Sequence, residues 1–272
     1  MAAPHRSTIS WTDYSGGDAN FATGCTPVSE GCARCYARAI YERFGKDFGE
    51  VRLNDQALMR LGHWKPKPPW KRERPMCFVC DTGDLFHDDV PFEFIGRAMN
   101  TFFSKPEIDW QILTKRPARM LEFFGWYGQQ SIRETGIYAF FDPFGPGALT
   151  KGSGIPRNIW IGVSVENQAR ADERIPLLLQ SLAEVRFVSV EPMLERIDLS
   201  AYLPRLSWVI AGAESGPNRR PFDVAWAGDL YEQCREAGVA FFGKQASGLK
   251  PGVPLELPGY GVVQEWPEPY RD

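Results

Sequence analysis

The sequence predicts an α/β fold, arranged as a partial or nearly closed TIM-like (β/α) barrel. Short apolar runs recur along the 272 residues, and segments with helical periodicity lie between them. The runs are too short for helices and rich in β-branched and aromatic residues, as strands are. The clear runs are Met76–Cys80, Trp110–Leu113, Ile159–Val163, Arg186–Val190, Trp208–Ala211 and Ala240–Phe242, and a weaker one is Ser7–Trp11.

Segments between these runs have the apolar spacing of helices. They are Ala33–Phe44, Phe92–Phe103, Ala118–Phe124, Asn167–Leu182 and Val224–Ala237. Alternation of strand and helix favours a parallel sheet covered by helices. The number of strands suits a partial or nearly closed barrel. A doubly wound open sheet is the alternative, but no GxGxxG follows the first strand, which weakens a dinucleotide-binding interpretation.

Two stretches interrupt this alternation. Residues 61–75 (LGHWKPKPPWKRERP) form a basic, proline-rich loop, and residues 125–156 are rich in Gly, Pro and aromatic residues. The second stretch predicts an irregular insertion. Because neither marks a domain boundary, we expect a single barrel domain over residues 1–272.

Composition and charge exclude several classes of protein. A hydrophobic fraction of 43% is ordinary for a globular chain and excludes a disordered one. The net charge of −3 gives no global signal for nucleic acid or membrane binding. No apolar run approaches the roughly 18 residues of a membrane helix. The N-terminal MAAPHRSTIS also lacks the apolar core of a signal peptide, so we expect a cytoplasmic protein with no membrane partner.

Three of the six cysteines lie within eleven residues, in the segment TGCTPVSEGCARCYA. Such crowding in a cytoplasmic protein points to metal or redox chemistry rather than to disulfides. Cys32 and Cys35 are three residues apart at a predicted helix start, so both sulfurs can face one object. The loop containing Pro27 and Gly31 can fold back to bring Cys25 to the same point. Three thiolates suit a [4Fe–4S] cluster in which the fourth iron stays open to a substrate or cofactor.

Other interpretations of the cysteines remain open at this level. Cys32-x-x-Cys35 together with Cys77-x-x-Cys80 would supply four thiolates for zinc. Against zinc, Cys77 and Cys80 lie in a strand-like run, where side chains three apart point to opposite faces. For Cys77, Cys80 and Cys234, the favoured interpretation is that they are buried core thiols.

Eight motifs run through most of the chain: ISWTD, TGCTPVSEGCARCYA, CDTGDLFHDDVP, ILTKRP, IGVSVEN, SVEPML, AGAESGPNRRP and FFGKQ. In these motifs the chain resembles the radical S-adenosylmethionine superfamily, and more closely a small set of phage-associated three-cysteine proteins of unknown function. Two features depart from the superfamily: six residues rather than three separate the first two cysteines, and Arg34 replaces the aromatic residue common before the last one.

The resemblance implies a (β/α) barrel that holds a [4Fe–4S] cluster on Cys25, Cys32 and Cys35. S-adenosylmethionine would bind the open iron, and an electron from an external donor would cleave it to a 5′-deoxyadenosyl radical. That radical would act on an unidentified substrate. The protein would contribute positioning and exclusion of water, since the cofactor carries the chemistry.

Polar residues follow the predicted strands, at the end of a barrel where chemistry gathers. A cofactor with an ammonium, a carboxylate and ribose hydroxyls needs such a mixture of charges. We therefore expect the cofactor to be bound by Asp81, Asp84, Lys115, Glu166, Glu191 and Glu214. The alternative is that they are polar only because loops meet water.

The basic loop suggests a nucleic-acid substrate, DNA or RNA, because cations neutralise phosphates and exposed indoles stack on bases. The candidate contacts are Lys65, Lys67, Trp70, Lys71, Arg72, Arg219 and Arg220. The alternative is a solvated loop whose tryptophans pack on the barrel. Two rival functions follow from the same residues: a nucleic-acid-binding protein with a structural zinc site, and a barrel that keeps the cluster but has lost catalysis.

Overall fold

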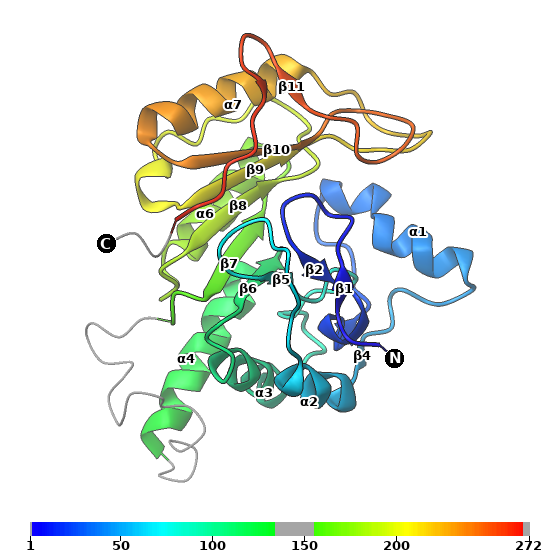
Figure 1. The fold of residues 1–272 in the computed structure, drawn as a ribbon, viewed down its shortest axis with the longest axis vertical. Helices are drawn as coiled ribbons and strands as arrows, with labels where there is room; N and C mark the ends of the chain where they lie inside the picture. The colour runs from blue at the N-terminus through cyan, green and yellow to red at the C-terminus, as the bar shows by residue number, and fades with distance from the viewer. Residues whose placement is uncertain (1, 134–154, 269–272) are drawn as a thin grey trace.

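The computed structural model describes residues 2–133 and 155–268, and its centre is an eight-stranded sheet (Figure 1). In sheet order the strands are β1 (His5–Arg6), β2 (Tyr14–Ser15), β5 (Met76–Phe78), β6 (Asp109–Thr114), β7 (Ile159–Ser164), β8 (Arg186–Val190), β9 (Trp208–Gly212) and β10 (Ala240–Gln245). β1 and β2 pair antiparallel, and every later pair is parallel. The sheet curls with β1 and β10 at its two edges, so the protein is a partial TIM-like barrel, as predicted.

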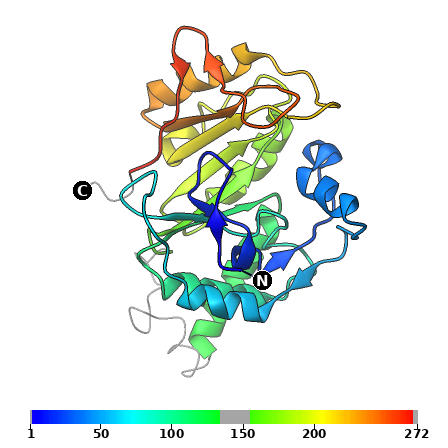
Figure 2. The ribbon, with the colours of Figure 1, turned by 45° about the vertical axis from the view of Figure 1, so that its right-hand side comes forward.

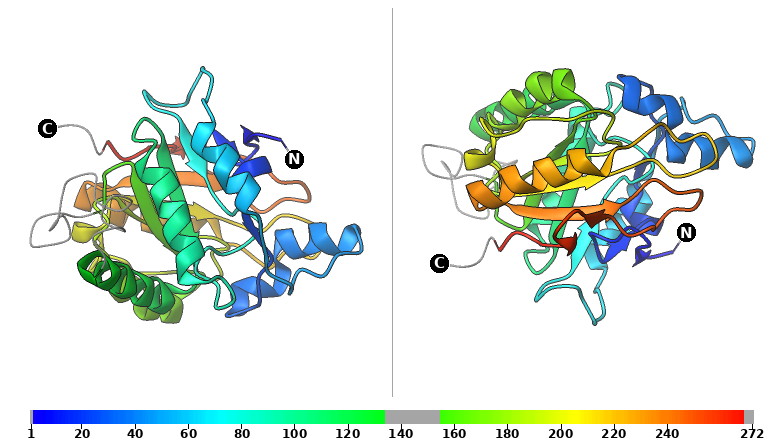
Figure 3. Two further views of the ribbon diagram at one scale, coloured as in Figure 1. Left: turned by 90° about the horizontal axis from the view of Figure 1, so that it is seen from below. Right: turned by 90° about the horizontal axis from the view of Figure 1, so that it is seen from above.

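Helices cover the outer face of this sheet, and smaller elements join them (Figures 1 and 3). The covering helices are α2 (Asp55–His63), α3 (Phe92–Phe103), α4 (Pro117–Arg133), α6 (Gln168–Leu178) and α7 (Val224–Ala237). The smaller elements are η1 (Gly17–Ala19), β3 (Ala22–Thr23), η2 (Glu30–Arg34), α1 (Tyr36–Arg43), β4 (Arg52–Leu53), η3 (Leu203–Arg205), β11 (Glu256–Leu257) and β12 (Gly261–Val262). Helix α1 stands apart from the other helices in every view (Figures 1 to 3). None of the described helices is both long and apolar enough to cross a bilayer.

The strands bury apolar side chains on both faces, which is why they appear as nearly continuous apolar runs in the sequence. On the outer face they join a large core beneath the helices. On the inner face a second cluster fills the barrel near the amino ends of the strands: Trp11, Met76, Phe78, Trp160, Val185, Phe187, Trp208, Ile210 and Phe242. The partly buried Trp266 near the carboxyl terminus packs against this cluster, and its indole N–H donates to the carbonyl of Trp11 at 3.1 Å. That end of the barrel is therefore packed solid.

The six clear predicted strands are confirmed, each within three residues at either end. The weak strand at Ser7–Trp11 is wrong: a turn occupies these residues, and Trp11 is buried as a plug of the barrel floor. Helix α2 was not predicted, and it takes up the first three residues of the expected loop 61–75.

Helix α4 runs to Arg133, so the expected insertion 125–156 begins as helix. Residues 134–154 of that insertion lie outside the described part of the chain.

Candidate functional site

Cys25 is held by backbone contacts beside the carboxyl end of β5. Its N–H donates to the carbonyl of Phe48 at 2.8 Å, and the N–H of Gly24 donates to the carbonyl of Thr82 at 3.0 Å. Gly24 has a φ of +87°, and a Cβ there would lie 2.2 Å from the carbonyl oxygen of Glu50. Only glycine fits where the chain passes this carbonyl, so Gly24 fixes the backbone conformation just before Cys25.

Cys32 and Cys35 lie on one tight turn. Cys32 is within η2, and Cys35 is the N-cap of α1, with its N–H directed at the carbonyl of Cys32 at 3.3 Å. The predicted helix start at Ala33 is therefore three residues early. Cys25, Cys32 and Cys35 are all half-buried free thiols, so a bound group could reach each sulfur.

Two cations at the end of β6 meet two of these sulfurs. Lys115 Nζ lies 3.8 Å from Cys32 Sγ, and Arg116 NH1 lies 3.4 Å from Cys25 Sγ. Because Lys115 and Arg116 are adjacent, the same strand end gathers Cys25 and Cys32, and the η2 turn keeps Cys35 near Cys32. Cations beside sulfur favour the thiolate, the form that binds metal.

The two thiols nevertheless differ in acidity. Burial raises the pKa of Cys25 to about 11, and Asp84 adds to this, while Arg116 opposes it. Burial also acts to raise the pKa of Cys32, but Lys115 and backbone N–H groups of the preceding loop outweigh it. The net pKa of Cys32 is therefore lower than usual.

Glu166 supports the cysteine turn from beneath. It is fully buried, and its Oε1 accepts from the N–H of Gly31 at 3.1 Å. Its Oε2 accepts from Arg174 NH1 at 3.1 Å and lies 3.9 Å from Lys115 Nζ. A Cβ on Gly31 would be 2.8 Å from Lys115 Nζ and 3.0 Å from Glu166 Oε1. The missing side chain of Gly31 thus lets η2 sit directly on this ion pair.

Asp84 supports the two cations in a similar way. Its buried carboxylate accepts from the hydroxyl of Thr114 at 2.7 Å and from the backbone N–H of Lys115 at 3.1 Å. It also lies 3.5 Å from Arg116 NH1. These bonds fix the turn that follows β6 and aim its cations at the sulfurs.

The other predicted carboxylates line the same end of the barrel. Asp81 accepts from Asn20 at 2.5 Å, and its carbonyl accepts from the hydroxyl of Tyr36. Glu191 lies 2.7 Å from Lys244 Nζ, which links the ends of β8 and β10. Gly212 of β9 lies between them, where a Cβ would be 2.9 Å from Glu191 Oε1.

Glu214 joins the loop after β9 to the cysteine turn. It accepts from the backbone N–H of Arg220 at 2.8 Å and lies 3.6 Å from Arg34 NH1. Arg220 NH1 donates onward to the carbonyl of Glu30 at 2.9 Å. Burial acts to raise the pKa of Glu214, but its bonds to Arg220 outweigh this, so the net shift of its pKa is downward.

The basic loop lies at the opposite end of the strands. Arg72 and Arg74 reach Asp109, the first residue of β6, at 3.5 and 3.1 Å. The N–H of Lys71 donates to Asp13 at 2.8 Å, and Trp70 packs against the core.

Lys65 and Lys67 are exposed on the same loop. Arg219 and Arg220, by contrast, follow β9 at the cysteine end; Arg219 donates to the hydroxyl of Ser247 at 2.9 Å. The basic loop and the pair Arg219 and Arg220 therefore lie at opposite ends of the strands.

The four-thiolate zinc alternative is not formed. Cys77 and Cys80 are buried in the core, where burial raises the pKa of both thiols. Within residues 2–133 and 155–268, no three Cys, His, Asp or Glu side chains converge on one metal ion. A [4Fe–4S] cluster does not require its thiolates to converge on one point, because each thiolate binds a different iron. The half-buried donors and adjacent cations fit such a cluster.

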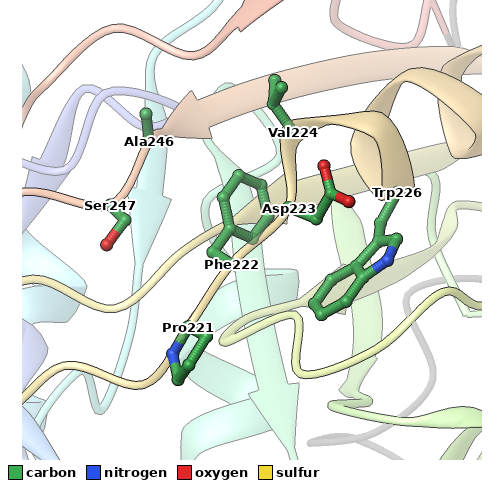
Figure 4. Close-up of a pocket in the computed structure, with 7 residues that line it drawn as sticks. All are labelled: Pro221, Phe222, Asp223, Val224, Trp226, Ala246 and Ser247. Carbon is green, nitrogen blue, oxygen red and sulfur yellow. The ribbon is translucent and has the colours of Figure 1, made fainter.

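A shallow pocket of about 500 Å³ lies beside the loop after β9 (Figure 4). Its wall includes the aromatic side chains of Phe222 and Trp226, with Ala246 and Ser247 from the end of β10. None of the cysteines or predicted carboxylates lines it, but Ser247 in its wall accepts from Arg219.

Arg174 is the supporting residue that sequence reasoning missed. Its signal was available: Ala171, Arg174, Ile175 and Leu178 share one buried helical face, so a cation stands among apolar positions. A buried cation requires a buried anion, which would have pointed to Glu166.

Comparison with known proteins gives a family and a set of solved structures. A family model described as "Protein of unknown function (DUF5131)" matches residues 6–253. No curated protein matches the chain. These matches do not test the expected phage association, which stays a prediction.

The solved structures are of spore photoproduct lyase. Its complex with dinucleoside spore photoproduct has 13% identity and a TM-score of 0.48, covering 90% of this chain and 78% of that chain. A cysteine-to-alanine mutant with the same dinucleoside has 13% identity and a TM-score of 0.49, with coverage of 90% and 78%. A double mutant with bound AdoMet and the dinucleoside has 12% identity and a TM-score of 0.44, covering 90% and 80%.

Proposed function

Since the chain belongs to the family described as "Protein of unknown function (DUF5131)", we propose from its own residues that it is a radical S-adenosylmethionine enzyme. Cys25, Cys32 and Cys35 would hold a [4Fe–4S] cluster at the carboxyl ends of the strands. When bound and reduced, this cluster would supply the electron that cleaves S-adenosylmethionine to a 5′-deoxyadenosyl radical. The reaction that follows on the substrate is unassigned.

One observation carries the proposal: two of three neighbouring half-buried thiols each have a cation at the sulfur. Lys115 and Arg116 would offset the negative charge of the bound thiolates and stabilise them. A structural core thiol has no need of such partners.

The chain's ion pairs suit a zwitterionic ligand. The methionine end of the cofactor carries an ammonium and a carboxylate close together. Glu191 and Lys244 present the two complementary charges 2.7 Å apart, and both are partly accessible. We propose that this pair opens to receive the amino-acid group, while Asp81 and Glu214, at neighbouring strand ends, remain candidates for the ammonium or the ribose hydroxyls.

For Glu166, Asp84 and Lys115 we propose a role other than contact with the cofactor. The carboxylates of Glu166 and Asp84 are buried and already engaged, and Lys115 is committed to Cys32 and Glu166. We propose that these three position the cysteine turn and the cations rather than touch the cofactor.

For a nucleic-acid substrate, the usable cations would be those at the cysteine end. Arg34, Arg219 and Arg220 lie there, whereas the loop 61–75 does not. A steep fall of single-strand affinity with salt, reduced by Arg219→Ala, would support this substrate class. Salt-independent or absent binding would contradict it.

The test of the cluster uses anaerobic reconstitution of the purified chain. Wild type and Cys77→Ala should take up iron and sulfide, whereas Cys25→Ala, Cys32→Ala and Cys35→Ala should lose most of both. Mössbauer spectra would identify the cluster. Addition of S-adenosylmethionine and dithionite should then release 5′-deoxyadenosine and methionine. Full iron retention by Cys25→Ala, or no cofactor cleavage by the wild type, would overturn the proposal.

A further inference from the structure

Helix α1 carries an exposed apolar stripe next to the cysteines. Tyr36, Ile40 and Phe44 recur every four residues and are 56%, 42% and 71% exposed. Of the eight residues in the helix, only Ala37 is buried. Side chains four apart lie on one helical face, so the three form a continuous strip that the described part of the chain leaves open.

The helix and the turn after it carry more positive than negative charge. Residues 36–46 contain the basic residues Arg38, Arg43 and Lys46 against a single acid, Glu42, whereas Arg34, just before the helix, lies 3.6 Å from Glu214. The whole chain has a net charge of −3, so this surface opposes the overall sign. Of the next two acids, Glu50 is paired with Arg52, whereas Asp47 accepts only from the uncharged backbone N–H of Gly49 at 2.7 Å and keeps its charge.

We propose that this face of α1 is the docking surface for the protein that delivers the electron, a small acidic one-electron carrier with a flavin or an iron–sulfur group. The inference rests on the proposed function. An apolar centre with a polar rim is the usual anatomy of a protein interface. A basic rim selects an acidic partner and speeds its encounter. Weak redox complexes bury little area, which suits an eight-residue helix.

The position of the helix also suits a docking surface for an electron carrier. Cys35 is its N-cap, so the stripe starts at the residue next to a proposed cluster ligand. Tyr36 bonds to the carbonyl of Asp81 at the end of β5, which ties the start of α1 to the site. A carrier seated on the stripe would therefore lie close to the cysteines without entering the mouth where the substrate must bind. Figure 1 shows α1 projecting from the body, open to such a partner.

Other occupants fit less well. A second copy of this chain would bring the same basic rim against itself, and like charges repel. Nucleic acid would be drawn by the cations, but the aliphatic Ile40 separates the aromatic side chains of Tyr36 and Phe44, so successive bases could not stack without a break along the stripe. Both alternatives are separable by experiment.

The experiment measures binding of two probes, an acidic flavodoxin and a plant-type ferredoxin, to the cluster-loaded protein by calorimetry. Ile40→Glu and Phe44→Glu should each weaken binding at least about tenfold, because each loses an apolar contact and adds a negative charge that repels an acidic partner. Met59→Glu is the matched control: Met59 is 69% exposed, on α2, and its change should leave affinity alone. Raising salt from about 50 to about 300 mM should weaken wild-type binding.

Cofactor cleavage driven by dithionite should be the same in all variants, because a small reductant needs no docking face. That assay separates the two proposals: loss of dithionite-driven cleavage in the wild type counts against the proposed function, whereas the binding data test the surface. Equal affinity of Ile40→Glu and wild type would overturn the surface. So would absence of binding to both probes, a wild-type dimer that Ile40→Glu dissociates, or single-strand binding abolished by Phe44→Glu.

Discussion

Replacing Glu166 by Gln tests whether the buried pair beneath the cysteine turn is structural. Glu166 and Arg174 are 0% and 1% exposed in their side chains and are 3.1 Å apart. Glutamine keeps the volume but has one acceptor oxygen for two donors, the N–H of Gly31 and the guanidinium of Arg174. Whichever way the amide turns, an N–H faces a donor and the cation of Arg174 loses its anion.

Removing one partner of a buried ion pair costs about 3–5 kcal/mol, because an uncompensated charge is left in the interior. We expect Glu166→Gln to lower the free energy of unfolding by that amount. The measurement is urea denaturation of the metal-free protein followed by circular dichroism. Glu173→Gln is the matched control. Glu173 pairs with Arg170 on the same helix, but its side chain is 53% exposed, so its loss should cost less than about 1 kcal/mol.

A second variant tests whether the loss of stability comes from the unpaired Arg174 rather than from the glutamine itself. Adding Arg174→Met to Glu166→Gln removes the orphaned cation and should restore part of the lost stability. If Glu166→Gln costs no more than Glu173→Gln, the carboxylate is not compensating Arg174. Glu166 would then be free to contact a ligand, and the positioning role assigned to it would be wrong.

Two further predictions concern the cysteines. A Cβ at Gly24 would lie 2.2 Å from a backbone carbonyl oxygen, whereas a Cβ at Gly45, which has a similar positive φ, would meet nothing within 4 Å. Gly45→Ala is therefore the control, and it should lower the free energy of unfolding by about 1–2 kcal/mol through its backbone conformation alone. Gly24→Ala should lower the melting temperature more than Gly45→Ala does, and it should also reduce iron uptake. Equal effects of the two substitutions would contradict the predicted clash at Gly24. In metal-free protein near pH 8, Cys32 should react with iodoacetamide before Cys25, because its pKa is lowered and that of Cys25 is raised to about 11. Peptide mass spectrometry gives the order, and Lys115→Met should slow Cys32 only; the reverse order would contradict the placement of Lys115.

Strands were predictable from the sequence because their burial is two-sided. In β7 and β9 every residue is buried, so the apolar runs are uninterrupted and bounded by polar loops. Helix α2 was missed because a proline-rich segment follows it directly. Its start signal was nevertheless present: Asn54 is the N-cap and accepts from the N–H of Ala57 at 2.9 Å.

Long-range pairing was the part that sequence could not supply. Arg72 and Arg74 read as a solvated basic run, yet they meet Asp109, some 35 residues away. Trp11 lies in an apolar run that resembles a strand, but it is buried in a turn beneath Trp208. The local sequence pattern predicts that a residue will be buried, but which residues it contacts depends on the complete fold.

The inner face of the half-barrel explains why the chemistry would gather at one end only. Near the amino ends of the strands it is filled by large rings, such as Trp160, Phe187 and Trp208. Toward the carboxyl ends the strands carry small residues, such as Ser189 and Gly212, on β8 and β9. A charged cofactor placed among the rings would lose its hydration without gaining polar partners, which is costly. Among the small residues it would find both room and the ion pairs of the strand ends. The inner face thus changes from large rings near the amino ends of the strands to small residues near their carboxyl ends. This change confines a polar ligand to the end where the cysteines lie.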